Sequence, residues 1–252
     1  MPQFSDDLFL GTAQGYVGVN NNNSLGDPAP MDIGVGPLGR IYIWDIVPLT
    51  KQTGNIAAAQ SPTSTYTLTA GTGATQVVRN DGVVVIQVDV PRAVAVTLGA
   101  GTVTNRNVTV TGYDYYGQPM SEVIATGTTQ STTVPGKKAF YQISGATVSG
   151  AVGVTTSIGT TDVLGFPFRI TDRGYIDNVG WNNTLAEDAA TTVIADSTTA
   201  TTTTGDVRGT VTPSSAADGT KRLVVGIYLP ALAVGPNATR LGALGVNQNL
   251  VS

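Results

Sequence analysis

Hydrophobic and polar residues alternate along most of the chain from residue 40 onward, in short segments rich in valine, isoleucine and threonine. The segment IYIWDIV at 41–47 is typical, and it ends at Pro48. Alternation with a period of two is the pattern of half-buried β-strands. The strands predicted in this way lie at 41–47, 65–70, 75–80, 83–90, 93–98, 106–116, 121–126, 138–144, 152–158, 166–170, 175–181, 206–212 and 222–229.

The segments between these strands carry turn residues. Asp81-Gly82 stands between two apolar runs, and this dipeptide in that setting strongly predicts a hairpin. Many short strands joined by such turns predict an all-β fold, either an antiparallel β-sandwich or one or more jelly-roll-like domains. The chain has few glutamates and lysines and no 3.6-residue period, so helix is expected only around 185–190, where Asn183 or Thr184 could cap it.

Residues 1–39 form a different kind of segment, rich in glycine, asparagine and proline. These residues interrupt regular structure, so the segment cannot build a core of its own and is expected to be an extended N-terminal arm. A free terminus seldom carries apolar anchors, and the alternative of an untied end is therefore disfavoured. The anchors that predict docking of the arm, on its own domain or on a neighbour, are Phe4, Leu8, Phe9, Leu10 and Tyr16.

The rest of the chain is expected to divide near residue 172. Residues 40–172 form the predicted main antiparallel β domain. Residues 173–252 form a second β segment with a C-terminal tail, either packed on the first domain or folded as a smaller β domain. The threonine-rich stretch 195–206 is expected to be a long exposed hairpin or a mobile loop.

Composition excludes most catalytic chemistry. The 252 residues include no cysteine and no histidine, so Ser-His-Asp triads, Cys-His pairs, zinc sites and disulfides are ruled out. We expect no metal and no cofactor. Charged residues make up only 12% of the chain and the net charge is -4, which argues against binding nucleic acid. The longest apolar stretch, 223–235, contains a proline and is too short to span a membrane.

Two local features of the sequence bear on catalytic chemistry. The sequence GVGPLG at 34–39 matches a dinucleotide-binding fingerprint, but a strand rather than a helix follows it, so a hinge after the arm is expected. Paired carboxylates remain the one open enzymatic route, because a glycosidase needs only two acids. Aspartates also dominate turns, where they cap backbone amides, and we assign no catalytic residue. The acids considered are Asp114, Glu122, Asp162, Asp172 and Asp177.

Aromatic residues suggest a contact surface. Tyr113, Tyr115 and Tyr116 gather near a predicted hairpin end, and tyrosine combines contact area with a hydrogen bond at small entropic cost. We predict a protein-contact patch there, with a mixture of core and rim as the alternative. The aromatic residues within strand patterns are expected in the core: Trp44, Phe140, Tyr141, Phe166, Phe168 and Trp181.

Several segments resemble structural proteins encoded near the capsid gene of tailed bacteriophages. They are NVTVTGYDYYGQPMSE at 107–122, GKKAF at 136–140, GTTDVLGFP at 159–167 and TGDVRGT at 204–210. The resemblance spans roughly residues 80–230 and is strongest to capsid decoration, or cement, proteins. It implies a non-enzymatic protein that binds the outer surface of an assembled head and bridges capsomers, and it brings no catalytic residues with it.

The resemblance also sets the expected partners and location. The partners are the major capsid protein and further copies of this chain, as a homodimer or homotrimer, with no nucleic acid and no membrane. No basic and apolar leader opens the sequence, so we expect synthesis in the bacterial host cytoplasm and a final place on the outer surface of the virion head. The alternatives are a tail or tail-fibre component that binds or cleaves host-surface carbohydrate through an Asp/Glu pair, and a receptor-binding module.

Overall fold

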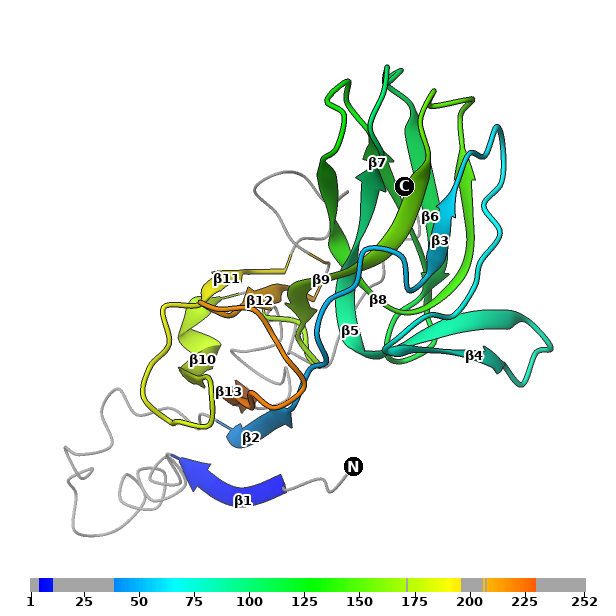
Figure 1. Cartoon of the computed structure of the whole chain (residues 1–252). Helices are drawn as coiled ribbons and strands as arrows, with labels where there is room; N and C mark the ends of the chain where they lie inside the picture. The colour runs from blue at the N-terminus through cyan, green and yellow to red at the C-terminus, as the bar shows by residue number, and fades with distance from the viewer. Residues whose placement is uncertain (1–4, 11–38, 171, 196–205, 207, 230–252) are drawn as a thin grey trace, which may run out of the picture.

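The computed structural model describes residues 5–10, 39–170, 172–195, 206 and 208–229 (Figure 1). Within these residues the regular structure consists of strands and one short 3-10 helix, η2 (Arg173–Tyr175). The strands form two sheets in which neighbouring strands run antiparallel. The predicted all-β, antiparallel fold is therefore confirmed.

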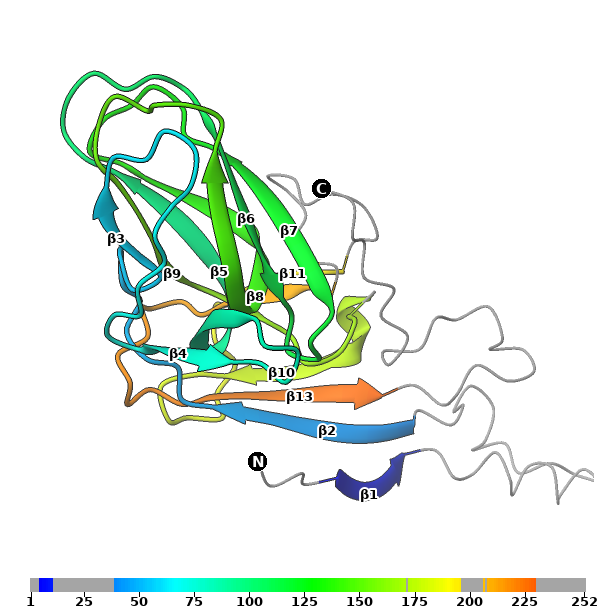
Figure 2. The same cartoon turned by 90° about the vertical axis from the view of Figure 1, so that its right-hand side faces the viewer.

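The smaller sheet has four strands, which lie side by side in Figure 2. Their order is β1 (Ser5–Leu10), β2 (Gly39–Ile46), β13 (Leu223–Leu229) and β10 (Ile176–Gly180). Successive side chains of β2 point to opposite faces of the sheet, so Trp44 is buried whereas Ile43 is exposed. The inner face of β13 is equally apolar, with Leu223, Val225 and Ile227 fully buried.

The larger sheet has nine strands and curls around its own core. Its main path is β11 (Thr191–Val193), β12 (Thr210–Thr212), β9 (Thr156–Gly165), β5 (Val84–Leu98), β8 (Thr133–Val148), β6 (Asn107–Tyr113) and β7 (Pro119–Ala125). Two short strands extend it off this path: β3 (Ala57–Gln60) pairs with β9, and β4 (Ala74–Val78) pairs with β5.

A proline lies inside the central strand β5. The sequence predicted two strands there, at 83–90 and 93–98, but the chain forms one strand that runs through Pro91. The pairing of β5 with β8 shifts between Gln87 and Arg92, so the proline sits at an irregularity where its missing amide costs no ladder hydrogen bond. Val90, the residue before this proline, packs in the second core.

Two hydrophobic cores result. The first fills the curl of the large sheet and includes the fully buried Phe140 and Ile143. The second lies between the small sheet and the nearby end of the large sheet, where the rings of Trp44 and Phe166 have centroids 5.6 Å apart. The second core joins residues from both sides of position 172, and strands after that position lie in both sheets.

A connecting segment, residues 47–56, leads from β2 to β3 and crosses β9. The amide of Thr160 donates to the carbonyl of Gln52 at 2.8 Å, and the hydroxyl of Ser157 donates to the carbonyl of Thr53 at 2.7 Å. Gly159 lies between these two contacts. The main chain of the segment therefore rests directly on the main chain of β9.

Some predicted elements are absent from the described residues. Segments 65–70 and 166–170 are not strands, apart from one isolated β-bridge at Thr65. The backbone amides of these segments donate hydrogen bonds to several different parts of the chain and not to one neighbouring strand. The amides of Phe166 and Ile170, for example, donate to the loop before β12. The helix expected at 185–190 was wrong. There the amide of Asp188 donates to the carbonyl of Val179, and Glu187 forms an isolated β-bridge with Gly180. Pairing with β10 therefore overrides the local helix propensity of this segment.

Candidate functional site

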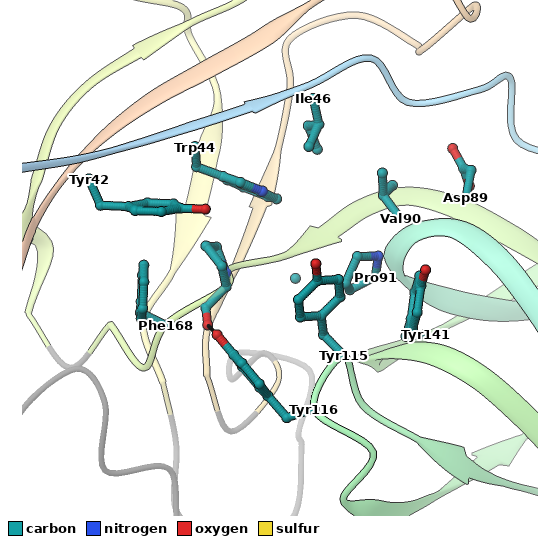
Figure 3. Close-up of a pocket in the computed structure, with 12 residues that line it drawn as sticks. Tyr42, Trp44, Ile46, Asp89, Val90, Pro91, Tyr115, Tyr116, Tyr141 and Phe168 are labelled. Atoms are coloured by element: carbon teal, nitrogen blue, oxygen red, sulfur yellow. Dashed lines mark hydrogen bonds between the residues drawn. The ribbon is translucent and has the colours of Figure 1, made fainter. Parts of the chain in front are cut away.

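An aromatic cavity of about 900 Å³ lies at the junction of the two sheets (Figure 3). Its volume falls in the range of small-molecule sites. Five separate segments supply the wall, so the cavity is built entirely by the tertiary fold. The lining residues are Tyr42, Trp44, Ile46, Asp89, Val90, Pro91, Tyr115, Tyr116, Tyr141, Gly165, Pro167 and Phe168.

Alternate side chains of β2, which share one face of the strand, form one wall of the cavity, and a tight turn carries the opposite wall. The turn between β6 and β7 is organised by the buried carboxylate of Asp114, whose Oδ1 accepts from the amides of Tyr116 at 2.8 Å and Gln118 at 2.9 Å. Gly117 has a φ of 79°, a conformation that glycine adopts without strain. Aspartate and glycine thus fix the direction in which Tyr115 and Tyr116 leave the turn.

The aromatic rings hold one another in place. Tyr115 lies between two neighbours, with centroids 5.4 Å from Tyr116 and 5.2 Å from Tyr141. Tyr42 meets Phe168 edge to face at 4.8 Å. These separations are those of favourable aromatic pairs, and each pair contributes about 0.5–1.5 kcal/mol beyond the area it buries.

The phenol hydroxyls of the cavity differ in whether they form a hydrogen bond within the protein. Tyr116 donates to the carbonyl of Pro167 at 2.7 Å, which anchors its ring. The hydroxyls of Tyr42, Tyr115 and Tyr141 have no hydrogen bond to any other described residue, and they point into the cavity in Figure 3. Burial, assisted by the neighbouring Tyr115, raises the pKa of both Tyr42 and Tyr141, so both are neutral phenols at physiological pH.

The cavity has little charge of its own. Asp89 is the one charged side chain among its described lining residues. Its Oδ2 accepts from the amide of Leu49 at 2.7 Å and from the buried guanidinium of Arg92 at 2.7 Å. Arg92 in turn donates to the carbonyl of Leu49. The charge of the Asp89 carboxylate is therefore paired with that of Arg92, and both side chains are hydrogen-bonded to the connecting segment.

The predicted contact residues fall into separate places. Tyr115 and Tyr116 lie together in the cavity wall, whereas Tyr113 packs beneath Arg79, whose guanidinium carbon is 3.6 Å from the ring centroid. Of the arm residues, Leu8, Phe9 and Leu10 belong to β1, whose side chains are not described, and Phe4 and Tyr16 lie outside the described residues.

Sequence reasoning placed several wall residues in the core instead. Trp44 is indeed buried, but Tyr141 and Phe168 are half-buried and line the cavity, and Tyr42 was not singled out. One signal was present: two aromatic residues, Tyr42 and Trp44, stand two apart and therefore share one face of a strand.

The five acids weighed for catalysis are all engaged in structural contacts, and none lines the aromatic cavity. Asp114 and Asp172 act at turns, as expected for aspartates, whereas Glu122, Asp162 and Asp177 lie within strands. Asp114 holds the β6–β7 turn, Glu122 accepts from the amides of Lys137 and Lys138, Asp162 pairs with Lys51, Asp172 caps η2, and Asp177 accepts from the hydroxyl of Tyr228.

The part of the chain that the structure describes lacks both a candidate metal site and a membrane-spanning helix. Its residues contain no group of three or more carboxylates, histidines or cysteines arranged to hold a metal ion. In the same residues no helix is long and apolar enough to cross a membrane. Comparisons of the whole chain with protein-family models, with curated proteins and with solved structures found no match.

Proposed function

We propose that this chain is a non-enzymatic structural protein of a tailed-phage virion, which binds the outer surface of the assembled capsid and bridges neighbouring capsomers. The sequence segments that resemble decoration proteins support this proposal. One of them, 107–122, forms the hairpin of β6 and β7 with its tyrosine turn. Partners would be the major capsid protein and other copies of this chain.

The observation that carries the proposal is the way the arm is attached. β1 adds to the edge of the small sheet, antiparallel to β2, with Ser5 opposite Tyr42 and Leu10 opposite Gly39. Residues 11–38 separate the two strands, so the arm reaches the edge by strand addition rather than through a tight hairpin. Main-chain pairing of this kind can equally be made with a neighbouring subunit, which is an economical way to link copies.

The engagement of the carboxylates favours binding over hydrolysis. A glycosidase needs one acid and one second carboxylate facing the same substrate. Here Asp114 and Glu122 accept hydrogen bonds from backbone amides, and Asp162 forms a 3.0 Å ion pair with Lys51. A tail component that cleaves carbohydrate through an Asp/Glu pair is therefore the less supported alternative.

Deleting residues 1–10 is expected to weaken binding to capsids by about tenfold or more, because each subunit loses one of its points of attachment and the avidity gained from it. The measurement is co-sedimentation of the purified protein with phage heads that lack it, followed by electron microscopy of the pellets. The full chain serves as the reference, and circular dichroism checks that the deletion variant keeps its β structure. Failure of the full chain to bind heads, or equal binding by the deletion variant, contradicts the proposal.

A further inference from the structure

We propose that the aromatic cavity is a binding site for a neutral saccharide of two or three rings. This proposal goes beyond attachment to a capsid and does not depend on it. It rests on three properties of the described wall: aromatic rings on opposite sides, phenol hydroxyls that converge on the cavity without a hydrogen-bond partner among the described residues, and the absence of an available charge.

The ring faces match one side of a sugar. A pyranose presents an apolar face of C–H groups, and such a face packs on the negative face of an aromatic ring. The cavity offers Trp44 and Tyr42 from β2 on one wall and Tyr115 and Tyr141 on the other (Figure 3). Rings on opposed walls can sandwich successive sugar units, which a single exposed ring cannot do.

The hydroxyls decide between a sugar and an apolar peptide. Those of Tyr42, Tyr115 and Tyr141 face the cavity without a partner among the described residues. A peptide side chain of the Leu or Pro type would displace water from them and leave each unsatisfied, at a cost of binding affinity. Sugar hydroxyls both donate and accept, as phenols do, so they can replace the lost water contacts.

Charge decides between a neutral and an anionic sugar. The described wall has no cation that faces the cavity, and Asp89 is already paired with Arg92. A uronic acid or sialic acid would lie near this carboxylate without a partner for its own charge, which is unfavourable in a partly buried site. A neutral hexose or N-acetylhexosamine meets no such penalty.

The wall is also preorganised, which reduces the entropy lost on binding. Tyr116 is fixed by its bond to Pro167, and Asp114 fixes the turn that carries Tyr115. Gly165 leaves no free space behind this wall, since a Cβ there would overlap the Cβ of Ala139. The rings therefore need little rearrangement to accept a ligand.

The test is a glycan array that holds neutral and anionic glycans, followed by titration with maltotriose, cellotriose and chitotriose up to about 10 mM, a range suited to weak sites. Fluorescence reports binding directly because Trp44 lies in the wall. We expect saturable binding of at least one neutral glycan. Tyr115→Phe and Tyr141→Phe should each weaken it by roughly three- to tenfold, the loss of one hydrogen bond with the ring retained.

Tyr113→Phe is the matched control, since Tyr113 lies under Arg79 and not in the cavity, and it should leave affinity unchanged. Thermal melting verifies that all three variants are folded. The proposal is overturned if no neutral glycan binds, if only anionic glycans bind, or if Tyr113→Phe weakens binding as much as the cavity variants do. A wild-type protein that binds glycans but not capsids overturns the proposed capsid function alone.

Discussion

Replacing Gly159 with alanine is expected to destabilise the protein by about 3 kcal/mol or more, one of the largest effects available from a single methyl group. A Cβ at this position would overlap the carbonyl oxygen of Gln52 and stand 2.5 Å from the carbonyl carbon of Thr53. Both are main-chain atoms, so no side chain can rotate away to make room. The connecting segment would have to lift from β9.

The cost includes the hydrogen bonds that hold this crossing. Lifting the segment lengthens the bond from the Thr160 amide to Gln52 and the bond from Ser157 to Thr53. Both hydrogen bonds lie in a largely buried region, where leaving a donor or acceptor without a partner costs free energy of folding. The same segment carries Leu49, which is bonded to Asp89 in the cavity wall, so the substitution should also disturb the aromatic cavity.

Urea unfolding of the wild type and of Gly159→Ala measures this effect. The matched control is Gly54→Ala, in the same segment, where the nearest atom to the new Cβ is at 3.6 Å. That change should be neutral or stabilise the fold by up to about 1 kcal/mol, because alanine restricts the unfolded chain. Equal unfolding midpoints for the two variants would show that the crossing is not tightly packed.

Alternation along the chain was sufficient to predict the fold class and many strands, because a period of two reports directly on a half-buried sheet. It also placed Trp44 of β2 in the core, and that side chain is buried. The turn role considered for Asp114 also agrees with its two amide contacts. These features depend on residues close together in the sequence, so the local sequence is enough to predict them.

Features that depend on distant segments could not be predicted. The sequence does not reveal that Pro91 would be tolerated inside a strand, since this depends on a register shift against β8. The cavity likewise needs Tyr42, Tyr115 and Tyr141 to meet from three different strands or turns. β3, with the sequence AAAQ, has no alternating pattern and is a strand only because β9 lies beside it.

The second large effect concerns Glu122, a buried carboxylate on β7 whose ionisation should make stability depend on pH. Burial raises its pKa from 4.5 to about 7, although the amides of Lys137 and Lys138 and the charge of Lys138 act in the opposite direction. Asp206 adds a further rise. Gly136 provides the space for this carboxylate, since a Cβ there would stand 2.5 Å from its Oε2.

The sign follows from the direction of the shift. Between about pH 4.5 and pH 7 the folded protein holds a proton on Glu122 that the unfolded chain has lost, so this group stabilises the fold most at low pH. Its contribution disappears as the pH rises through about 7, and the total change is about 3 kcal/mol. Asp45, with its pKa lowered by Arg222, acts in the opposite direction and loses its stabilising effect in acid.

The substitution Glu122→Gln isolates this contribution, because glutamine has a similar shape and no titrating proton. Urea unfolding at pH 5 and pH 8 should show that the wild type, relative to the variant, loses about 2.5 kcal/mol between the two values, since part of the total is already lost at pH 5; contributions such as that of Asp45 cancel in the difference. Glu187→Gln, at the exposed second glutamate of the chain, is the control: it keeps Glu122, so it should retain the pH dependence of the wild type. If the wild type and Glu122→Gln follow parallel pH profiles, Glu122 is ionised in the folded protein across this range, and the amides of Lys137 and Lys138 outweigh its burial.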